Sequence, residues 1–315
     1  MGWPGSSSGA TRRAPSGRPH PSIDLRNALV RRTEPARSTI WNTARRRPIA
    51  ALSYERGCTT IVATEEPTPD FTIALPDERE LDQNEEFCDL LIDGRSQRVR
   101  FHDYARIFEI PGLYEGLFVE TLKCASPDVV AGLLAESVRA AGEDPADLRV
   151  LDFGAGNGMV AEALARTGAR TFYGLDLLPE ARMAALRDRP GLYVDYLADD
   201  VTTLDADDAA VLRDARLNCL VCVAALGFDD VPPAAFAAAF NYVGSPGWCA
   251  FNLRDRFVDQ PGAFSQLLDR MVREGVIEET AHTRYQHRLS VAGQPLFYDA
   301  VVARKLRDIP LDWVR

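Results

Sequence analysis

The amino-acid sequence predicts an α/β protein: a doubly wound parallel sheet with helices on both faces, a C-terminal antiparallel hairpin and a small N-terminal cap. Two observations predict this fold. From residue 148 onward, short apolar runs alternate with amphipathic segments, which is typical of a parallel sheet with crossover helices. The last two strand-like runs flank the short turn Ala292-Gly293-Gln294-Pro295, so we expect them to pair as an antiparallel hairpin.

The predicted elements follow one another closely. We expect parallel strands over residues 149–153, 171–175, 193–197, 217–223 and 248–253. Helices are expected over residues 159–167, 179–187, 232–243 and 262–274, and the closing hairpin over 284–291 and 296–304. An earlier helix is expected to start at Ser126-Pro127-Asp128 and to end near Gly142, since an N-cap serine followed by proline is typical of a helix start.

Two segments precede this pattern. Residues 1–66 are expected to be a disordered, Arg-rich tail, because the opening Gly, Ser, Pro and Arg cannot bury enough surface to offset the entropy of ordering. A transit peptide and a start codon assigned too far upstream are the alternatives. Residues 67–124 are expected to form the cap without an independent core, with a hairpin turning at Asp93-Gly94. The aromatic residues of this cap are Tyr104, Phe108, Tyr114 and Phe118.

Charge and composition limit the possible partners. The net charge is −10, but residues 1–50 carry ten arginines against two carboxylates (+8), so residues 51–315 carry −18. Nucleic-acid binding needs clustered positive charge, so we expect none by the folded part. No run approaches the roughly 18 apolar residues of a membrane-spanning helix. The six cysteines are scattered, and we expect reduced thiols in a cytoplasmic protein. The oligomeric state is left open.

The segment that indicates function directly follows the first parallel strand. Val150-Leu151-Asp152-Phe153-Gly154-Ala155-Gly156-Asn157-Gly158 leads from a strand through three alternate glycines into a helix. Glycine permits a tight turn and a close approach by a ligand, and the helix N-terminus offers free N–H groups. The segment therefore predicts a nucleotide or carboxylate site, with a plain turn as the alternative.

The spacing of the glycines separates two kinds of nucleotide site. The dinucleotide fingerprint G-x-G-x-x-G needs glycine where this chain has Met159, which disfavours a nicotinamide-dependent oxidoreductase. The form D-x-G-x-G-x-G, together with Asp176 after the second strand and Asp199-Asp200 after the third, resembles the class I S-adenosylmethionine (SAM) methyltransferases. The resemblance covers about residues 125–305. It implies a Rossmann-like seven-strand sheet with an antiparallel seventh strand, matching the terminal hairpin.

The resemblance also implies a cofactor, SAM, and a set of residues to bind it. Asp152 would lie near the methionine amino group, and Asp176 would accept bonds from both ribose hydroxyls. Asp200 would bind the adenine amine, with Asp199 as the alternate; either could instead be a solvated loop residue, and Asp176 could simply cap a helix. The complete set of expected cofactor-binding residues is Asp152, Gly154, Ala155, Gly156, Asn157, Gly158, Asp176, Leu177, Asp199, Asp200, Val201 and Cys222.

No metal site is expected. Cys219 and Cys222 lie three residues apart in a strand, so their side chains point to opposite faces and cannot share a metal or form an easy disulfide. His102, His282 and His287 are too scattered in the sequence to form one.

The family's reaction needs the acceptor held in line with the methyl group, and it needs a base only for an acceptor that arrives protonated. No catalytic residue is therefore assigned. Tyr104, Tyr114, Asn252 and His287 are candidates for the acceptor pocket, and each could also be purely structural. The N-P-P-[YF] and Pro-Cys motifs of base-methylating enzymes are missing from the segment Cys222 to Phe228. We expect a methyltransferase with a small-molecule acceptor; a protein acceptor, or a SAM-binding protein without turnover, is the alternative.

Overall fold

The computed structural model describes residues 70–76, 81–226, 231–254 and 263–314. It also describes three two-residue strands, β1 (Asn42–Thr43), β2 (Ile49–Ala50) and β3 (Glu65–Glu66). The tail expected over residues 1–66 otherwise lies outside the described residues, as do Gly227 and Phe228 at the end of the fourth parallel strand. Within the described part, no helix has the length and apolar character needed to cross a membrane.

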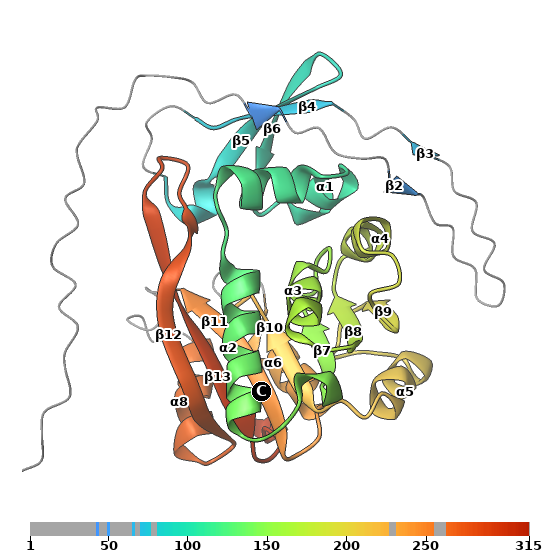
Figure 1. The fold of residues 1–315 in the computed structure, drawn as a ribbon, viewed down its shortest axis with the longest axis vertical. Coiled ribbons are helices and arrows are strands. Elements are labelled where there is room, and N and C mark those ends of the chain that lie inside the picture. Colours follow the sequence, from blue (N-terminus) through green and yellow to red (C-terminus); the bar gives the residue numbers. More distant parts are fainter. Residues whose placement is uncertain are drawn as a thin grey trace, which may run out of the picture. The chain divides into compact units, whose positions relative to one another are not determined.

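A seven-stranded sheet forms the centre of the fold (Figure 1). Its spatial order is β12-β13-β11-β10-β7-β8-β9, with parallel pairing from β11 to β9 and antiparallel pairing of β13 with both of its neighbours. The doubly wound sheet and the C-terminal hairpin predicted from the sequence are confirmed. The strand bounds are β7 Arg149–Phe153, β8 Thr171–Asp176, β9 Asp195–Ala198, β10 Cys219–Cys222, β11 Gly247–Arg254, β12 Ile277–Leu289 and β13 Pro295–Lys305.

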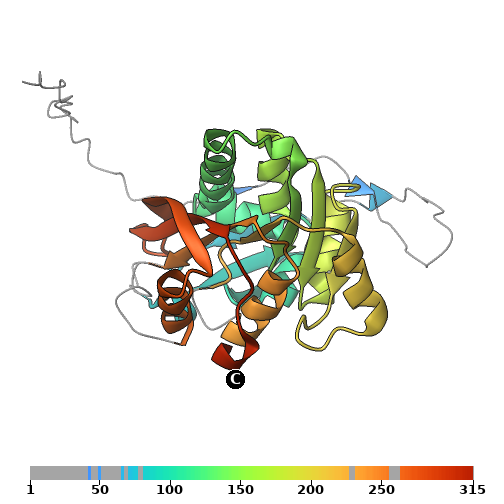
Figure 2. The same ribbon diagram turned by 90° about the horizontal axis from the view of Figure 1, so that it is seen from below.

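Helices cover both faces of this sheet (Figure 2). One face packs against α2 (Ser126–Ala140), α3 (Met159–Thr167) and α4 (Pro179–Asp188); the other packs against α5 (Ala206–Asp214), α6 (Pro233–Asn241) and α8 (Ala263–Arg273). Strand alternation divides the core between them. Cys219 belongs to the cluster under α2 and α3, and Cys222 to the cluster on the opposite face, as their spacing predicts. We did not predict α5, in which only Ala209 and Leu212 are buried.

The cap precedes this sheet in the chain. A second sheet has the order β1-β4-β5-β6, with β4 at Phe71–Ala74, β5 at Phe87–Ile92 and β6 at Arg95–Arg100. It is followed by α1 (Tyr104–Glu109) and the π-helical segment η2 (Glu115–Thr121). The expectation that the cap lacks a core of its own was wrong, because β4 and η2 supply additional apolar side chains. The cluster that they help to form includes Phe71, Ile73, Leu90, Ile107, Leu113 and Leu117.

Candidate functional site

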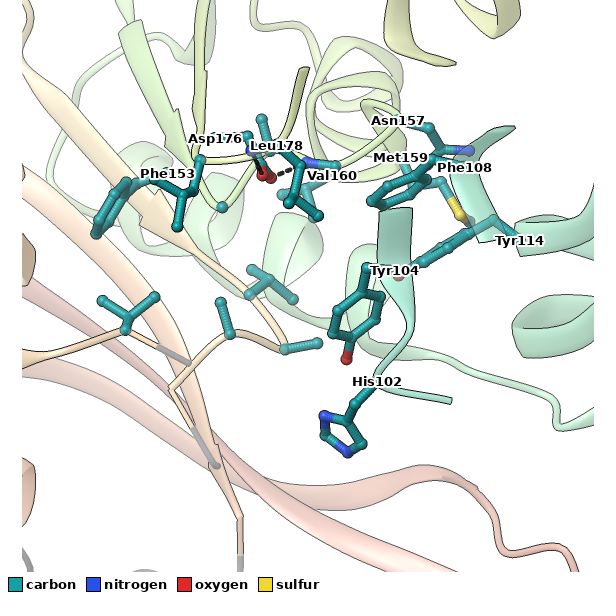
Figure 3. Close-up of a pocket in the computed structure, with 18 of the residues that line it drawn as sticks. His102, Tyr104, Phe108, Tyr114, Phe153, Asn157, Met159, Val160, Asp176 and Leu178 are labelled. Carbon is teal, nitrogen blue, oxygen red and sulfur yellow. Dashed lines mark hydrogen bonds between the residues drawn. The ribbon is translucent and has the colours of Figure 1, made fainter. Parts of the chain in front are cut away.

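A cavity of about 720 Å³ lies at the carboxyl ends of β7, β8, β9 and β10 (Figure 3). The chain runs outward from β7 through β8 to β9 and then returns to β10 on the other side of β7. Neighbouring connections therefore leave the sheet in opposite directions between β7 and β10, and a crevice opens there. Open α/β sheets bind ligands at such a switch point. The topology alone thus predicts where a ligand would lie.

The glycine turn and Asp176 form one hydrogen-bonded unit at this point. Gly154 and Gly156 have φ angles of +71° and +53°, in the left-handed region that favours glycine. Asp176 Oδ2 accepts a hydrogen bond from the Gly156 N–H at 2.9 Å, and its Oδ1 accepts one from Leu178 N–H at 3.0 Å (Figure 3). Burial raises the pKa of Asp176, while these N–H groups oppose the shift. The carboxylate is therefore held rigidly at the cavity wall.

Most of the residues expected to bind a cofactor line this cavity. They come from the end of β8 and from the loops after β7, β8 and β9: Gly154, Ala155, Gly156, Asn157, Asp176, Leu177, Asp199, Asp200 and Val201. Asp199 is exposed, and its Oδ1 accepts from the Asp200 N–H at 2.7 Å. Asp200 Oδ1 accepts from Thr202 through both its N–H and its hydroxyl, at 2.8 and 2.7 Å, and these bonds lower the pKa of Asp200.

Asp152, Gly158 and Cys222 were also expected at the site but do not line the cavity. Alternation along β7 directs Asp152 toward the helix layer of α3 and α4, since it pairs with Gly174 on the same face as Val150. There it is 1% exposed and accepts a hydrogen bond from the Tyr193 hydroxyl at 2.8 Å. Burial raises the pKa of Asp152 to about 7. Cys222 is fully buried in the core on the opposite face, where burial raises the pKa of its thiol.

The cap supplies an aromatic wall opposite the glycine turn. Tyr104, Phe108, Tyr114 and Phe118 follow one another with ring-centroid distances of 6.2, 5.2 and 4.8 Å, and all four line the cavity. The first three are labelled in Figure 3. The Phe108 ring lies directly against Gly156: a Cβ atom there would be 3.1 Å from Cζ of Phe108. The sequence showed these aromatic residues but not that they face the glycine turn. Their i, i+4 spacing in two short segments is the signal that could have placed them on one surface.

Ion pairs hold the cap beside the glycine turn. Glu115 of η2 accepts hydrogen bonds at Oε1 from Asn157 Nδ2 at 2.8 Å and from Arg189 at 3.0 Å. Arg189, which follows α4, also pairs with Glu162 of α3 and donates to the backbone carbonyl of Asn157. All three side chains of the Glu115–Arg189–Asn157 contact are buried or nearly so. Asn157, expected at the cofactor, thus also fastens the cap.

A buried polar cluster lies at the other end of the cavity, and we call it the Ser126 cluster: Ser126, Asn252, Tyr285 and His287. Ser126 Oγ lies 2.6 Å from both Tyr285 Oη and His287 Nδ1. Asn252 Nδ2 donates to Tyr285 Oη at 2.8 Å and to Ser126 Oγ at 3.2 Å. Ser126 and His287 line the cavity, and burial lowers the pKa of His287 to about 3, with a smaller effect from Arg288.

The acceptor-pocket candidates are therefore partly brought together. Tyr104, Tyr114 and His287 line the same cavity, whereas Asn252 does not line it but donates a hydrogen bond to Ser126, which does. Sequence reasoning missed Ser126 itself, which it treated only as a helix start. Within the described residues, no three His, Cys, Asp or Glu side chains are grouped so as to hold a metal ion.

Comparison with known proteins identifies relatives of the sheet domain. A family model described as a methyltransferase domain matches residues 130–293. A ubiquinone biosynthesis O-methyltransferase from Thiobacillus denitrificans is 32% identical over 108 residues, which is 34% of this chain and 45% of that protein. The protein of the same name from Xanthomonas axonopodis is 35% identical over 109 residues, 33% of this chain and 41% of that one. The chain thus spans less than half the length of these curated relatives.

Solved structures also resemble the chain. An S-adenosylmethionine-dependent methyltransferase from Clostridium acetobutylicum superimposes with a TM-score of 0.41 at 12% identity, covering 62% of this chain and 96% of that one.

Proposed function

The chain belongs to the class I SAM-dependent methyltransferases, and we propose that it transfers the methyl group of SAM to an oxygen atom of a small aromatic molecule bound in the cavity beneath the cap. The observation that carries the proposal is the cavity itself. One end of it is formed by the glycine turn and Asp176, and its other walls include aromatic cap residues and, from the Ser126 cluster, Ser126 and His287. Its volume of about 720 Å³ lies within the roughly 300–1,000 Å³ of small-molecule sites.

The residues present fit SAM. Asp176 is a partly buried carboxylate at the end of β8, and its two backbone hydrogen bonds leave further lone pairs for the ribose hydroxyls. A Cβ on Gly156 would meet the Phe108 ring, and one on Gly154 would lie 3.0 Å from the Ala225 Cβ, so side chains at these two positions would crowd the turn beside the cavity. We assign the ribose to Asp176, the methionine part to the loop Gly154–Asn157, and the adenine amine to Asp200 or Asp199. Asp152 would act on the bound cofactor indirectly, through its hydrogen bond with Tyr193 and through its charge.

SAM supplies an electrophilic methyl group on a sulfonium. The chain then has to hold the acceptor in line with this group and keep water away, and orientation alone can provide a large part of the acceleration. The cap residues Tyr104, Phe108 and Tyr114 stack on one another and line the cavity, which gives it an aromatic wall that suits a flat aromatic acceptor. Burial raises the pKa of Tyr114 well above its ordinary value, so its hydroxyl keeps its proton and cannot serve as a base.

Two further points support a small acceptor methylated on oxygen. The cap limits access to the cavity, and it is fastened to the sheet domain by the Glu115–Arg189 contact. The curated relatives carry the name O-methyltransferase and act in ubiquinone biosynthesis according to that name.

Titration calorimetry with SAM tests the site. We expect Asp176→Ala to weaken SAM binding by about 10- to 100-fold, the effect of losing hydrogen bonds to a charged group worth about 1.5–3 kcal/mol. Asp214→Ala is the matched control, because Asp214 is exposed at the end of α5 and does not line the cavity. Undiminished binding by Asp176→Ala would overturn the assignment.

Turnover is tested separately, with labelled SAM and a panel of phenols, carboxylic acids and amines of one or two rings. We expect label to appear in a phenol or another oxygen acceptor. Tight SAM binding with no labelled product from any acceptor, or from a cell extract, would favour a SAM-binding protein without turnover. Label recovered in protein would favour a protein acceptor.

A further inference from the structure

The hydrogen-bond directions in the Ser126 cluster can be deduced from its connection to the backbone. Asn252 Oδ1 accepts the N–H of Ala224 at 2.6 Å, which distinguishes the oxygen of this side chain from its nitrogen. Ala224 has a φ angle of +60°, which is unusual for a residue other than glycine, and it lines the cavity just after β10. Asn252 Nδ2 therefore donates both of its hydrogens, one to Tyr285 Oη and one to Ser126 Oγ.

The two hydroxyl hydrogens then have a single arrangement in which both are used. If Tyr285 donates to Ser126 and Ser126 donates to His287 Nδ1, every hydroxyl hydrogen has an acceptor among the described residues. In the opposite direction His287 Nδ1–H would donate to Ser126 and Ser126 to Tyr285, leaving the Tyr285 hydrogen without an acceptor in the described structure. The first arrangement is favoured because unpaired buried donors cost free energy.

One further group lies near His287 Nδ1. The Cys124 sulfur is 3.9 Å from this nitrogen, and burial raises the pKa of Cys124, so the group is a thiol, which can donate or accept a weak hydrogen bond. The shorter contact with Ser126 sets the direction: Nδ1 accepts from Ser126 Oγ, and the hydrogen of the neutral ring lies on Nε2. The other groups packed against the ring are Tyr298, stacked at 4.0 Å between centroids, and the neighbouring Arg288, which pairs with Glu86.

His287 Nε2 remains available to a molecule in the cavity. Nε2 has no hydrogen-bond partner among the described residues. Among those residues, Glu115 Oε2 is the only side-chain nitrogen or oxygen that is both fully buried and without a hydrogen-bond partner, so Nε2 is not fully buried. Nε2 is therefore accessible, and His287 lines the cavity although only 5% of its surface is exposed. The remaining accessible surface of the ring faces this space.

We propose that His287 presents a fixed Nε2–H donor to the methyl acceptor, held in that tautomer by the Tyr285–Ser126 relay. It thereby favours acceptors with an unprotonated oxygen, because an oxygen that carries negative charge accepts a stronger hydrogen bond than a hydroxyl does. Such an oxygen is the phenolate form of a hydroxyl or the carbonyl oxygen beside it. The inference rests on the function proposed above and adds to it a specificity-determining residue and a chemical class. His287 binds and orients the acceptor oxygen and does not take up a proton, so the hydroxyl proton leaves to solvent before methyl transfer.

The tautomer can be measured on the full chain without any acceptor. Long-range ¹H–¹⁵N correlation spectra of uniformly ¹⁵N-labelled protein distinguish Nε2–H from Nδ1–H histidine, and His287→Gln identifies the signals of His287 by their loss. We expect the Nε2–H pattern, unchanged from pH 5 to pH 8. An Nδ1–H pattern, or protonation of the ring within this range, would overturn the proposal. Ser126→Ala, which removes the donor to Nδ1, should give a mixture of both tautomers.

Binding of the acceptor class is tested with a matched pair of probes in the presence of S-adenosylhomocysteine. At pH 8, 4-nitrophenol presents a phenolate oxygen, whereas 4-nitroanisole has the same ring with that oxygen methylated. We expect His287→Phe to weaken 4-nitrophenolate binding by about 10- to 100-fold and 4-nitroanisole binding by less than about 2-fold, while His287→Gln, which keeps an N–H donor, loses less. Equal losses for both probes, or no saturable binding of the phenolate to the wild type, would contradict the proposed class.

S-adenosylhomocysteine binding by the same variants separates this inference from the function on which it rests. His287 lies in the Ser126 cluster, away from the glycine turn, so calorimetry should give the same affinity for the wild type and both His287 variants. If the wild type bound no S-adenosylhomocysteine, the proposed function would fail first. If binding were normal and the probes failed to discriminate, only the role of His287 would be wrong.

Discussion

Gly156→Ala should disturb the protein more than the loss of a glycine from a turn normally does, because Gly156 lies in contact with the cap. The new Cβ meets two penalties. The φ angle of +53° is unfavourable for alanine by about 1 kcal/mol. The methyl group would also lie 3.1 Å from Phe108 Cζ, closer than ordinary van der Waals contact, and 3.6 Å from Cε1.

The Phe108 ring cannot move away freely. It is 4% exposed and lies between the Tyr104 and Tyr114 rings, with α4 packed behind it. Forcing a methyl group into such a packed contact costs about 1–3 kcal/mol. We therefore expect Gly156→Ala to lower the free energy of unfolding by about 2–4 kcal/mol in total. Gly191→Ala is the matched control: its φ is +77°, a Cβ at this position would have no neighbour within 4 Å, and the substitution should cost about 1 kcal/mol.

Urea unfolding of the protein without cofactor measures these differences, and a double-mutant cycle isolates the contact. Phe108→Leu reduces the ring to a smaller apolar side chain, so the double variant should be less destabilised than the sum of the two single variants by about 1 kcal/mol. Additive effects within about 0.5 kcal/mol, or equal losses for Gly156→Ala and Gly191→Ala, would refute the predicted contact between cap and glycine turn.

Two further predictions concern buried charges. Asp152→Asn should stabilise the protein relative to the wild type above pH 7 but not at pH 4. The folded-state pKa of Asp152 is raised to about 7 from 3.8. The stability that the protonated carboxyl contributes to the wild type is therefore fully present below pH 3.8 and is lost as the pH rises through 7. The free energy of unfolding of Asp152→Asn relative to the wild type should therefore be greater at pH 8 than at pH 4 by a few kcal/mol. Lys305→Met should lower the free energy of unfolding by about 2–4 kcal/mol, because the fully buried Nζ donates to the carbonyls of Phe240 and Val243 at the end of α6. A thermal midpoint equal to that of the wild type would contradict this second prediction.

The half of the cavity nearest the glycine turn could be predicted from the sequence, because its determinants are local. Gly154, Gly156 and Asp176 occupy fixed positions after consecutive strands, and the carboxyl ends of parallel strands meet at one edge of the sheet. The role predicted for Asp152 stays a prediction, but the structure places this residue outside the cavity lining. Alternation along β7 directs this side chain away from the cavity, toward α3 and α4.

The other half could not be predicted, since its residues are distant in the sequence. Ser126 and His287 are separated by 161 positions and Glu115 and Arg189 by 74, and no periodicity or spacing connects them. The helix-start pattern at Ser126 was sufficient to explain a serine, so its buried bonds to Tyr285 and His287 left no separate signal. Which of these distant side chains contact each other depends on how the cap packs. The sequence predicted that a cap exists but not the apolar cluster that determines its packing.

The contacts between cap and sheet domain indicate that the cavity is largely formed before any ligand binds. The segment between η2 and α2 is paired to the end of β12, with Leu289 N–H donating to the Leu122 carbonyl at 2.7 Å and Ala125 N–H to the His287 carbonyl at 2.9 Å. Lifting the cap would break these bonds and the buried pairs of Arg288 with Glu86 and of Arg189 with Glu115. Breaking buried ion pairs is costly. The cap therefore behaves as a fixed wall, and an acceptor placed by such a wall and by His287 loses little further free energy in becoming oriented for methyl transfer.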